Sequence, residues 1–276
     1  MQTIYIPTRG RGPSRQITFA KIAPALRGDF LIRIVCPREE HDLFASCGFD
    51  VISHSEKNLG DTRQWVVDQH TGDNSVVMVD DDFVSWSARM DPAVGKYRKA
   101  VDADILQGFR TLFYNLQHFA NAGIGPRLFA NARQATELNT RVNGVVGYRK
   151  DILQEHGLRF CPLPEDLEMT IQLMRSGYAS ITDFTLVYDQ AMSNAAGGCS
   201  VYRTLDFHNA HHTQMNQWHP DYTRLVSKTT KDGWFAGQQR LENVIAWTKL
   251  VNDCYPAPIA EWAVGLPRVN RGPKIK

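Results

Sequence analysis

The amino-acid sequence predicts an α/β fold with a mixed, mostly parallel sheet and helices on both of its faces. Strand-like and helix-like segments alternate over the first 82 residues, which is the pattern of a parallel sheet covered on both sides. The chain has 276 residues, 43% of them hydrophobic, so it can build one large domain or one domain with an appended lobe.

The first part of the chain carries the clearest alternation. Strands are predicted at residues 3–7, 30–36, 50–54 and 75–79, and helices at residues 15–26, 38–47 and from Asp61 onwards. We expect Ser14 and Asp61 to cap the first and third of these helices and Pro37 to end the second strand. The strand at 75–79 is the most hydrophobic one and ends abruptly in three aspartates.

The rest of the chain continues the mixed pattern. Helices are predicted at residues 102–122, 165–176, 203–217 and 236–251, and strands at residues 126–131, 142–148 and 179–188. We expect residues 1–200 to form the α/β core. Residues 201–276 are expected to form a C-terminal helical extension that packs on this core.

Composition and charge disfavour a membrane-spanning protein and a protein with an overall basic surface. The net charge is only +2, so no overall basic field indicates nucleic-acid binding, although a local basic stripe would be enough for it. No apolar run approaches the roughly 18 residues of a membrane span, and no signal peptide is visible. The five cysteines are scattered without a CxxC pair, which is typical of reduced thiols. We therefore expect a cytoplasmic protein.

The acidic cluster Asp80-Asp81-Asp82 follows the most hydrophobic strand. Ligands of such sheets bind at the carboxyl ends of the strands. Asp80 and Asp82 are two apart, so in extended backbone they point to the same side and can hold Mg²⁺ or Mn²⁺ against a diphosphate. Asp81 is expected to point away from the cation and is counted with the nucleotide-binding residues. The alternative is a solvated acidic turn, which the position at a strand end disfavours.

A basic loop follows the first strand and opens on the same edge. Thr8, Arg9 and Arg11 are candidate nucleotide-binding residues, because the arginines can pair with phosphate and the glycines between them let a ligand approach the backbone. Asp61 and Arg63 are further candidates. A cation in the first turn of a helix opposes the helix dipole unless an anion lies nearby. A surface turn with solvated arginines remains the alternative for the loop.

Glu165 and Asp166 open the helix predicted at 165–176. Acidic residues are expected there from the helix dipole alone. Their functional interpretation is a general base, since transfer of a sugar to a hydroxyl with inversion needs a carboxylate near the acceptor oxygen. Asp166 is the first candidate for this base and Glu165 the second.

Four stretches together resemble the GT-A glycosyltransferases in their order and spacing. They are the strand ending in Asp80-Asp81-Asp82, the helix start at 59–64, the strand Val142–Arg149, and Leu163-Pro164-Glu165-Asp166, which is similar to the "xED" helix of that family. The resemblance covers roughly residues 3–190. It implies a GT-A-like fold, a metal held by the aspartates, and a nucleoside diphosphate sugar, most commonly a UDP-sugar, as the donor.

Two further stretches, Ile6–Arg11 and Gly197–Arg203, resemble the TET-associated glycosyltransferases of tailed bacteriophages. This narrower resemblance implies that the acceptor is DNA with hydroxymethylated pyrimidines such as 5-hydroxymethylcytosine, and that the protein works in the host cytoplasm. The base would have to be unpaired or flipped to reach the donor. The loop containing Gly197 is expected to close over the donor and exclude water.

Some assignments stay open at this level. GT-A enzymes often add a histidine to the metal, and the candidates here are His208, His211, His212 and His219. Three further cations can bind phosphate or DNA, or can be solvated charges without a ligand: Lys57, Arg133 and Arg141. Two other functions also fit the sequence: a nucleotidyltransferase that makes a sugar nucleotide, and a non-catalytic nucleic-acid-binding protein of the same fold.

Overall fold

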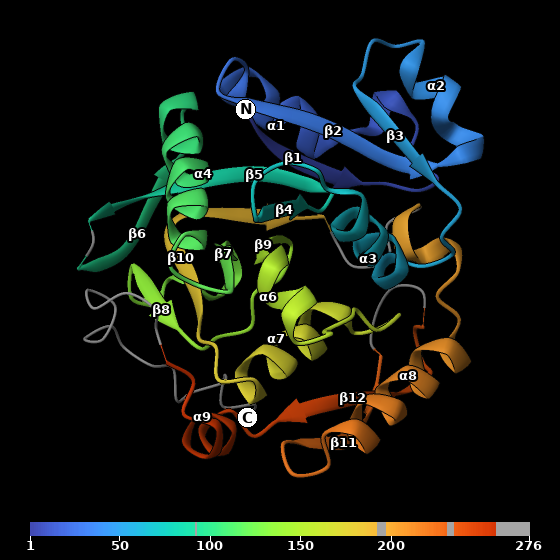
Figure 1. Ribbon diagram of the computed structural model, residues 1–276, viewed down its shortest axis with the longest axis vertical. Coiled ribbons are helices and arrows are strands. Elements are labelled where there is room, and N and C mark those ends of the chain that lie inside the picture. Colours follow the sequence, from blue (N-terminus) through green and yellow to red (C-terminus); the bar gives the residue numbers. More distant parts are fainter. Residues whose placement is uncertain (92, 192–196, 231–234, 258–276) are drawn as a thin grey trace.

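A ten-stranded mixed sheet is the framework of the computed structural model (Figure 1), which describes residues 1–91, 93–191, 197–230 and 235–257. In spatial order the strands are β3 (Val51–His54), β2 (Phe30–Pro37), β1 (Gln2–Pro7), β4 (Ser75–Val79), β9 (Val145–Arg149), β7 (Asn121–Pro126), β10 (Ser180–Gln190), β5 (Phe83–Asp91) and β6 (Val94–Lys99). The short β8 (Thr136–Leu138) pairs with β10 beside this path. Only β9, β5 and β8 run against the direction of the other described strands of this sheet. The predicted mixed sheet with most strands in one direction is confirmed.

Helices cover both faces of this sheet, because its central strands are apolar on both sides. On β4, Val77 and Val79 face a core shared with α1 (Ile17–Leu26), α2 (His41–Ala45) and α4 (Asp102–Leu116). Val76 and Met78 face the core beneath α3 (Leu59–Gln69), α6 (Lys150–Glu155) and α7 (Glu165–Arg175). A central strand buried on both faces is what the hydrophobic run at 75–79 predicts.

Several predicted boundaries are wrong. The strand expected at 126–131 is instead β7, which ends at Pro126, followed by the short helix α5 (Arg127–Ala130). The helix expected at 102–122 ends at Leu116, because residues from Asn121 pair with β9 and β10. The hairpin of β5 and β6 was not predicted at all. The cap residues also differ: Gln16 precedes α1 in place of Ser14, and Asn58 caps α3 in place of Asp61.

The C-terminal segment contains a β-hairpin as well as helices. Its elements are α8 (Leu205–Trp218), β11 (Thr223–Thr229), β12 (Gln239–Ile245) and α9 (Trp247–Cys254). The single helix predicted at 236–251 is therefore wrong in its first part, since residues 239–245 pair in register with β11. The predicted extension is thus not purely helical, and its residues 231–234 and 258–276 lie outside the described residues.

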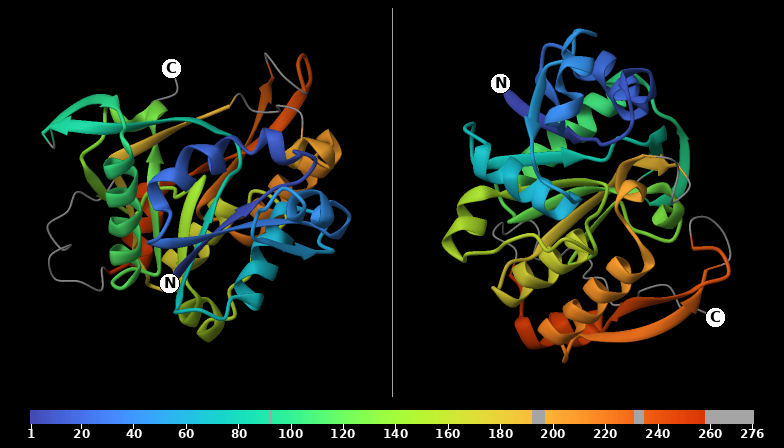
Figure 2. Two further views of the ribbon diagram at one scale, coloured as in Figure 1. Left: turned by 90° about the horizontal axis from the view of Figure 1, so that it is seen from above. Right: turned by 90° about the vertical axis from the view of Figure 1, so that its right-hand side faces the viewer.

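This segment packs on the core through α7. Leu167 and Ile171 of α7 are buried in one cluster with Met215 of α8 and with Leu250 and Val251 of α9. Figure 2 shows the segment, coloured orange to red, at the opposite end of the molecule from the N-terminal strands. Among the described residues, no helix has both the length and the apolar character needed to cross a membrane.

Substitution of Gly60 with alanine tests how tightly the start of α3 is packed. A Cβ at this position would lie 1.8 Å from the carbonyl oxygen of Cys161, so the helix start or the loop before α7 must move. We expect the free energy of unfolding to fall by about 3 kcal/mol, near the upper end of overpacking costs. Urea denaturation measures it. Gly12→Ala is the control, because its Cβ would meet only Leu43, at an ordinary 3.8 Å. Equal stability of the two variants would contradict this packing.

Candidate functional site

A cleft of about 300 Å³ lies at the carboxyl ends of β1, β3 and β4. The loops after these strands, the start of α7 and the segment at 197–203 form its walls. Of the residues predicted to bind the nucleotide, to act as the base, or to hold the metal through a carboxylate, all except Asp61 line the cleft: Thr8, Arg9, Arg11, Arg63, Asp80, Asp81, Asp82, Glu165 and Asp166. The structure therefore brings into one cavity side chains that are up to 158 positions apart in the sequence, from Thr8 to Asp166.

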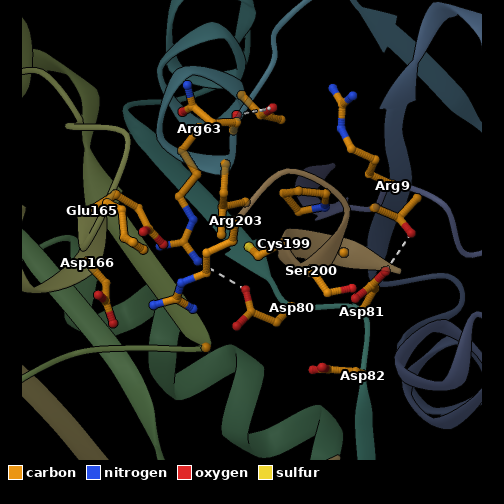
Figure 3. Close-up of a pocket in the computed structure, with 18 of the residues that line it drawn as sticks. Arg9, Arg63, Asp80, Asp81, Asp82, Glu165, Asp166, Cys199, Ser200 and Arg203 are labelled. Carbon is orange, nitrogen blue, oxygen red and sulfur yellow. Dashed lines mark hydrogen bonds and ion pairs between the residues drawn. The ribbon is translucent and has the colours of Figure 1, made fainter. Parts of the chain in front are cut away.

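Arg63 occupies the centre of the charged groups (Figure 3). Its guanidinium contacts Oδ1 of Asp80 at 3.0 Å through Nη2 and Oε1 of Glu165 at 3.2 Å through Nη1. The Arg63 side chain is only 2% exposed, the Glu165 side chain 8% and the Asp80 side chain 25%, so water screens the contact to Glu165 less than the contact to Asp80. Arg63 is the fifth residue of α3, and the anions that offset its charge are thus two carboxylates of the protein itself.

Asp81 is held on the opposite side of the acidic cluster, by the loop after β1. Its carboxylate accepts hydrogen bonds from the Thr8 hydroxyl and from Arg11, and the Gln16 amide donates to the same hydroxyl at 3.0 Å. Asp81 is 5% exposed. The side chain of Asp81 therefore supports the loop of Thr8 and Arg11.

Asp82 faces the cleft from the end of the cluster. Its Oδ1 accepts a hydrogen bond of 2.9 Å from Gln190, and its Oδ2 lies 3.3 Å from Arg11. Burial changes the proton affinities of Asp80 and Asp81. Burial raises the pKa of Asp80 to about 7 against the opposing effect of Arg63, and burial raises the pKa of Asp81 to about 6 against that of Arg11. Additional positive charge in the cleft would stabilise the ionised cluster.

Asp166 is paired with Arg141, which lies four residues before β9. The guanidinium donates to both carboxylate oxygens, from Nη2 to Oδ2 at 2.9 Å and from Nε to Oδ2 at 3.1 Å among other contacts. The Asp166 side chain is 9% exposed, whereas half of the Arg141 side chain is accessible. Glu165 and Asp166 thus have different cations as partners, one buried and one half-exposed.

Asp61 does not reach the cleft. Asn58 caps α3 by accepting a hydrogen bond of 2.9 Å from the Asp61 backbone N–H, and the Asn58 amide donates to the Asp61 carboxylate. Asn58 itself lines the cleft. The sequence analysis predicted Asp61, the acidic residue of this turn, as a site residue. In the structure Asn58, three residues earlier, lies next to the cavity.

The segment at 197–203 covers one side of the cleft and contacts the N-terminal loop. The Gly198 N–H donates to the Arg9 carbonyl at 2.6 Å, and the Tyr202 hydroxyl accepts from the Leu59 N–H at 2.9 Å. Gly197 has a φ of 92° and lies so close to Gly10 that a Cβ would meet the Gly10 oxygen at 2.9 Å. The two stretches that carry the narrower family resemblance are therefore neighbours in space.

Arg203 is a cleft residue that sequence reasoning did not single out. Its Nη2 donates to Nδ1 of His208 at 3.1 Å, while Nε2 of His208 lies 2.8 Å from the Leu241 carbonyl oxygen. These two contacts suit a neutral His208, and burial, with His212 and Arg203 nearby, lowers its pKa to about 4. The sequence feature that could have indicated Arg203 as a cleft residue is its position at the end of the 197–203 stretch.

The histidines considered as metal ligands do not line the cleft. They have other partners: His208 contacts Arg203, His211 contacts Gln214, His212 contacts Asn243, and His219 lies between Glu168 and Arg175. Within the described ranges, no group of three or more acidic, histidine or cysteine side chains forms a metal cage.

The residues at the acidic cluster nevertheless fit a divalent cation that arrives with a phosphate ligand. Mg²⁺ in such sites is held by one or two carboxylates together with substrate phosphates and water, rather than by a complete protein cage. Of the two carboxylate oxygens of Asp80, Arg63 contacts Oδ1, which leaves Oδ2 open to a cation. Oxygen donors of this kind suit Mg²⁺ or Mn²⁺.

No protein-family model and no curated protein matches the sequence. Solved structures do resemble it. A mannosyltransferase from Pyrobaculum calidifontis in complex with GDP-Man and Mn²⁺ matches with a TM-score of 0.50 and 13% identity, over 70% of this chain and 57% of that chain. A mycobacterial protein matches with a TM-score of 0.52 and 11% identity, over 89% of this chain and 84% of that one. The chain thus spans little more than half of the mannosyltransferase's length, and the likeness establishes a GT-A-like fold.

Substitution of Arg63 with methionine tests the buried ion pairs. It leaves Asp80 and Glu165 facing each other without a cation, so we expect the protein to lose about 3–5 kcal/mol of stability in urea denaturation. Arg141→Met is the matched comparison and should destabilise less, because Arg141 offsets one carboxylate where Arg63 offsets two, and half of its side chain is accessible to water. A larger effect of Arg141→Met would show that Arg63 is not the central cation.

Proposed function

We propose that this protein is a metal-dependent glycosyltransferase that moves a sugar from a nucleoside diphosphate sugar to an acceptor hydroxyl. One observation carries the proposal: in a cleft at the carboxyl edge of a GT-A-like sheet, a single buried arginine contacts both Asp80 at the end of β4 and Glu165 at the start of α7. The aspartates at the strand end suit a cation and its diphosphate, and the carboxylates of α7 suit the acceptor. The structural neighbour from Pyrobaculum, which binds GDP-Man and Mn²⁺, supports this assignment.

The donor would lie against the loop of Thr8, Arg9 and Arg11 and the first turn of α3. Mn²⁺ or Mg²⁺ bound by Asp80 and Asp82 would offset the negative charge that grows on the departing diphosphate. Asp81 would keep the N-terminal loop in place through its bonds to Thr8 and Arg11. Arg203 adds positive charge from the other side of the cleft. A UDP-sugar is the donor we propose first.

The acceptor hydroxyl would enter beside α7. As its oxygen bonds to the anomeric carbon, the bond from that carbon to the diphosphate oxygen breaks, and the hydroxyl proton passes to Asp166 or, alternatively, to Glu165. The fork of Arg141 orients Asp166, and Arg63 orients Glu165. The 197–203 segment would exclude water from the reacting centre, so that the sugar goes to the acceptor instead of being hydrolysed.

We further propose hydroxymethylated pyrimidines of DNA as the acceptor, with 5-hydroxymethylcytosine as the first choice. The stretches 6–11 and 197–203, which resemble phage enzymes of this kind, contact each other at the donor side of the cleft. Five unpaired cysteines agree with work in a reducing cytoplasm, such as that of an infected host cell.

Removal of the carboxylates tests the metal site. Asp80→Asn and Asp82→Asn should each lower Mn²⁺-dependent release of UDP from UDP-sugars at least about a hundredfold, because the cation contributes several kcal/mol to the transition state. Calorimetric titration should also show Mn²⁺-dependent binding of UDP in the wild type and its loss in both variants. Asp42→Asn, which alters an exposed carboxylate of α2, is the control.

Release of pyrophosphate from a nucleoside triphosphate in place of UDP would favour the nucleotidyltransferase. Unchanged DNA binding and unchanged phenotype in Asp82→Ala would favour a non-catalytic binding protein.

The general base is tested by Asp166→Asn and Glu165→Gln, with sugar transfer to hydroxymethylated DNA followed by mass spectrometry of nucleosides. Loss of the base should lower kcat about 10²–10⁴-fold while donor affinity stays the same. We expect the larger loss in Asp166→Asn. Equal activity of both variants and the wild type would remove these carboxylates from the mechanism, and no transfer to any pyrimidine would remove the DNA acceptor.

A further inference from the structure

A second groove, of about 480 Å³, lies on the α1 and α4 side of the sheet, over β5 and β6. Its walls come from α1, β5, β6 and the starts of α4 and α5. Figure 1 shows β6 at the free edge of the sheet, beside α4. None of the residues that line the first cleft belongs to this groove.

The groove is basic although the whole chain is nearly neutral. Its lining contains four cations, Lys21, Arg98, Lys99 and Arg127, against the acidic residue Asp102, and Arg98 also pairs with the carboxylate of Asp104 at 2.6 Å. Lys21 and Lys99 are exposed, and neither forms an ion pair or hydrogen bond through its side chain within the part of the chain that the structure describes. Two ammonium groups without a protein partner on one groove favour an anionic ligand.

Two aromatic side chains belong to the lining of the groove. The Arg127 guanidinium lies 4.5 Å from the centre of the Tyr97 ring, which holds this cation in place. Trp86 is 4% exposed, and its indole N–H is buried without a hydrogen-bond partner among the described residues, so a ligand in the groove does not reach it. The cations of the lining are therefore what matches the groove to an anionic ligand.

The floor of the groove follows the proposed metal site directly in the chain. β5 begins at Phe83, immediately after Asp82, and its residues 84–87 form the floor of the groove. The Thr18 hydroxyl of α1 donates to the Asp80 carbonyl at 2.7 Å and accepts from the Phe83 N–H at 2.8 Å. At about 3.3 Å per residue of strand, Ser87 lies roughly 17 Å along β5 from Asp82. A bound strand of a few nucleotides can span this length.

We propose that this groove binds the phosphate backbone of the acceptor DNA beside the base that enters the cleft. The proposal rests on the proposed DNA acceptor. Phosphate contacts position a nucleic acid without reading its sequence, which suits an enzyme that must present one modified base to the donor. Lys21 and Lys99 contact phosphates, and the base is unpaired or flipped toward Asp82 and Asp166.

The test compares Lys21→Gln/Lys99→Gln with the wild type in binding a short single-stranded oligonucleotide without modified bases, followed by fluorescence anisotropy. Because the double variant lacks two cations that pair with phosphates, we expect Kd to rise about tenfold at low salt and the slope of log Kd against log salt to fall by about 1.4. Arg224→Gln/Lys228→Gln is the matched control, since it removes two exposed cations from β11. It should leave both quantities unchanged.

Catalytic measurements separate this proposal from the function on which it rests. The Lys21→Gln/Lys99→Gln variant should release UDP and glycosylate the free hydroxymethylated nucleoside like the wild type, but should transfer about tenfold less sugar to DNA at low substrate concentration. If the wild type transfers no sugar to DNA, the acceptor assignment fails, while anisotropy still decides whether the groove binds DNA. Equal weakening by both double variants would overturn the groove. Equally tight, Lys21- and Lys99-dependent binding of dextran sulfate would overturn DNA as its ligand.

Discussion

The buried guanidinium of Arg63 is the constraint on which the arrangement of the cleft depends. A charge that is 2% exposed is tolerated only with close counterions, and Arg63 finds them at Asp80 and Glu165. These carboxylates belong to elements that are 85 positions apart in the chain, the end of β4 and the start of α7. One cation therefore fixes the distance between the proposed metal side and the proposed acceptor side. It also explains a cation at a helix start, where the dipole alone would oppose it.

At the other edge of the cleft, close backbone contacts hold the elements together in addition to ion pairs. The loop after β1 and the segment at 197–203 approach so closely that a Cβ on Gly197 would meet the carbonyl oxygen of Gly10 at 2.9 Å. Arg11 joins this contact to the acidic cluster through Asp81 and Asp82. The cover of the cleft and its floor are thus built from one set of contacts, so a donor held by the loop would also be held under the cover.

Sequence patterns predicted the parts of the molecule that depend on local periodicity. The helices α1, α3, α4 and α7 and the strands β1, β2, β4, β9 and β10 are all present, with shifts at their ends. Strand β12 was mistaken for part of a helix and β11 was not predicted, because pairing between residues 223–229 and 239–245 decides this hairpin and short amphipathic runs fit both periods. The hairpin of β5 and β6 was missed for a similar reason. Its strands lie near the edge of the sheet and mix exposed Val84 and Met90 with buried Trp86.

For the site, the sequence by itself determined which residues stand at the carboxyl edge of the sheet, because strand ends and helix starts follow from patterns within a few residues. It thus identified the aspartates after β4, the basic loop after β1 and the acidic start of α7. Only the tertiary structure decided the partners: Arg63 between Asp80 and Glu165, Arg141 on Asp166, and Asn58 in place of Asp61 at the cavity. It also assigned Arg203 to the cleft and the C-terminal histidines to other contacts. Partners of this kind depend on side chains that meet across long separations in sequence, and no local spacing encodes which of several similar charges will be neighbours.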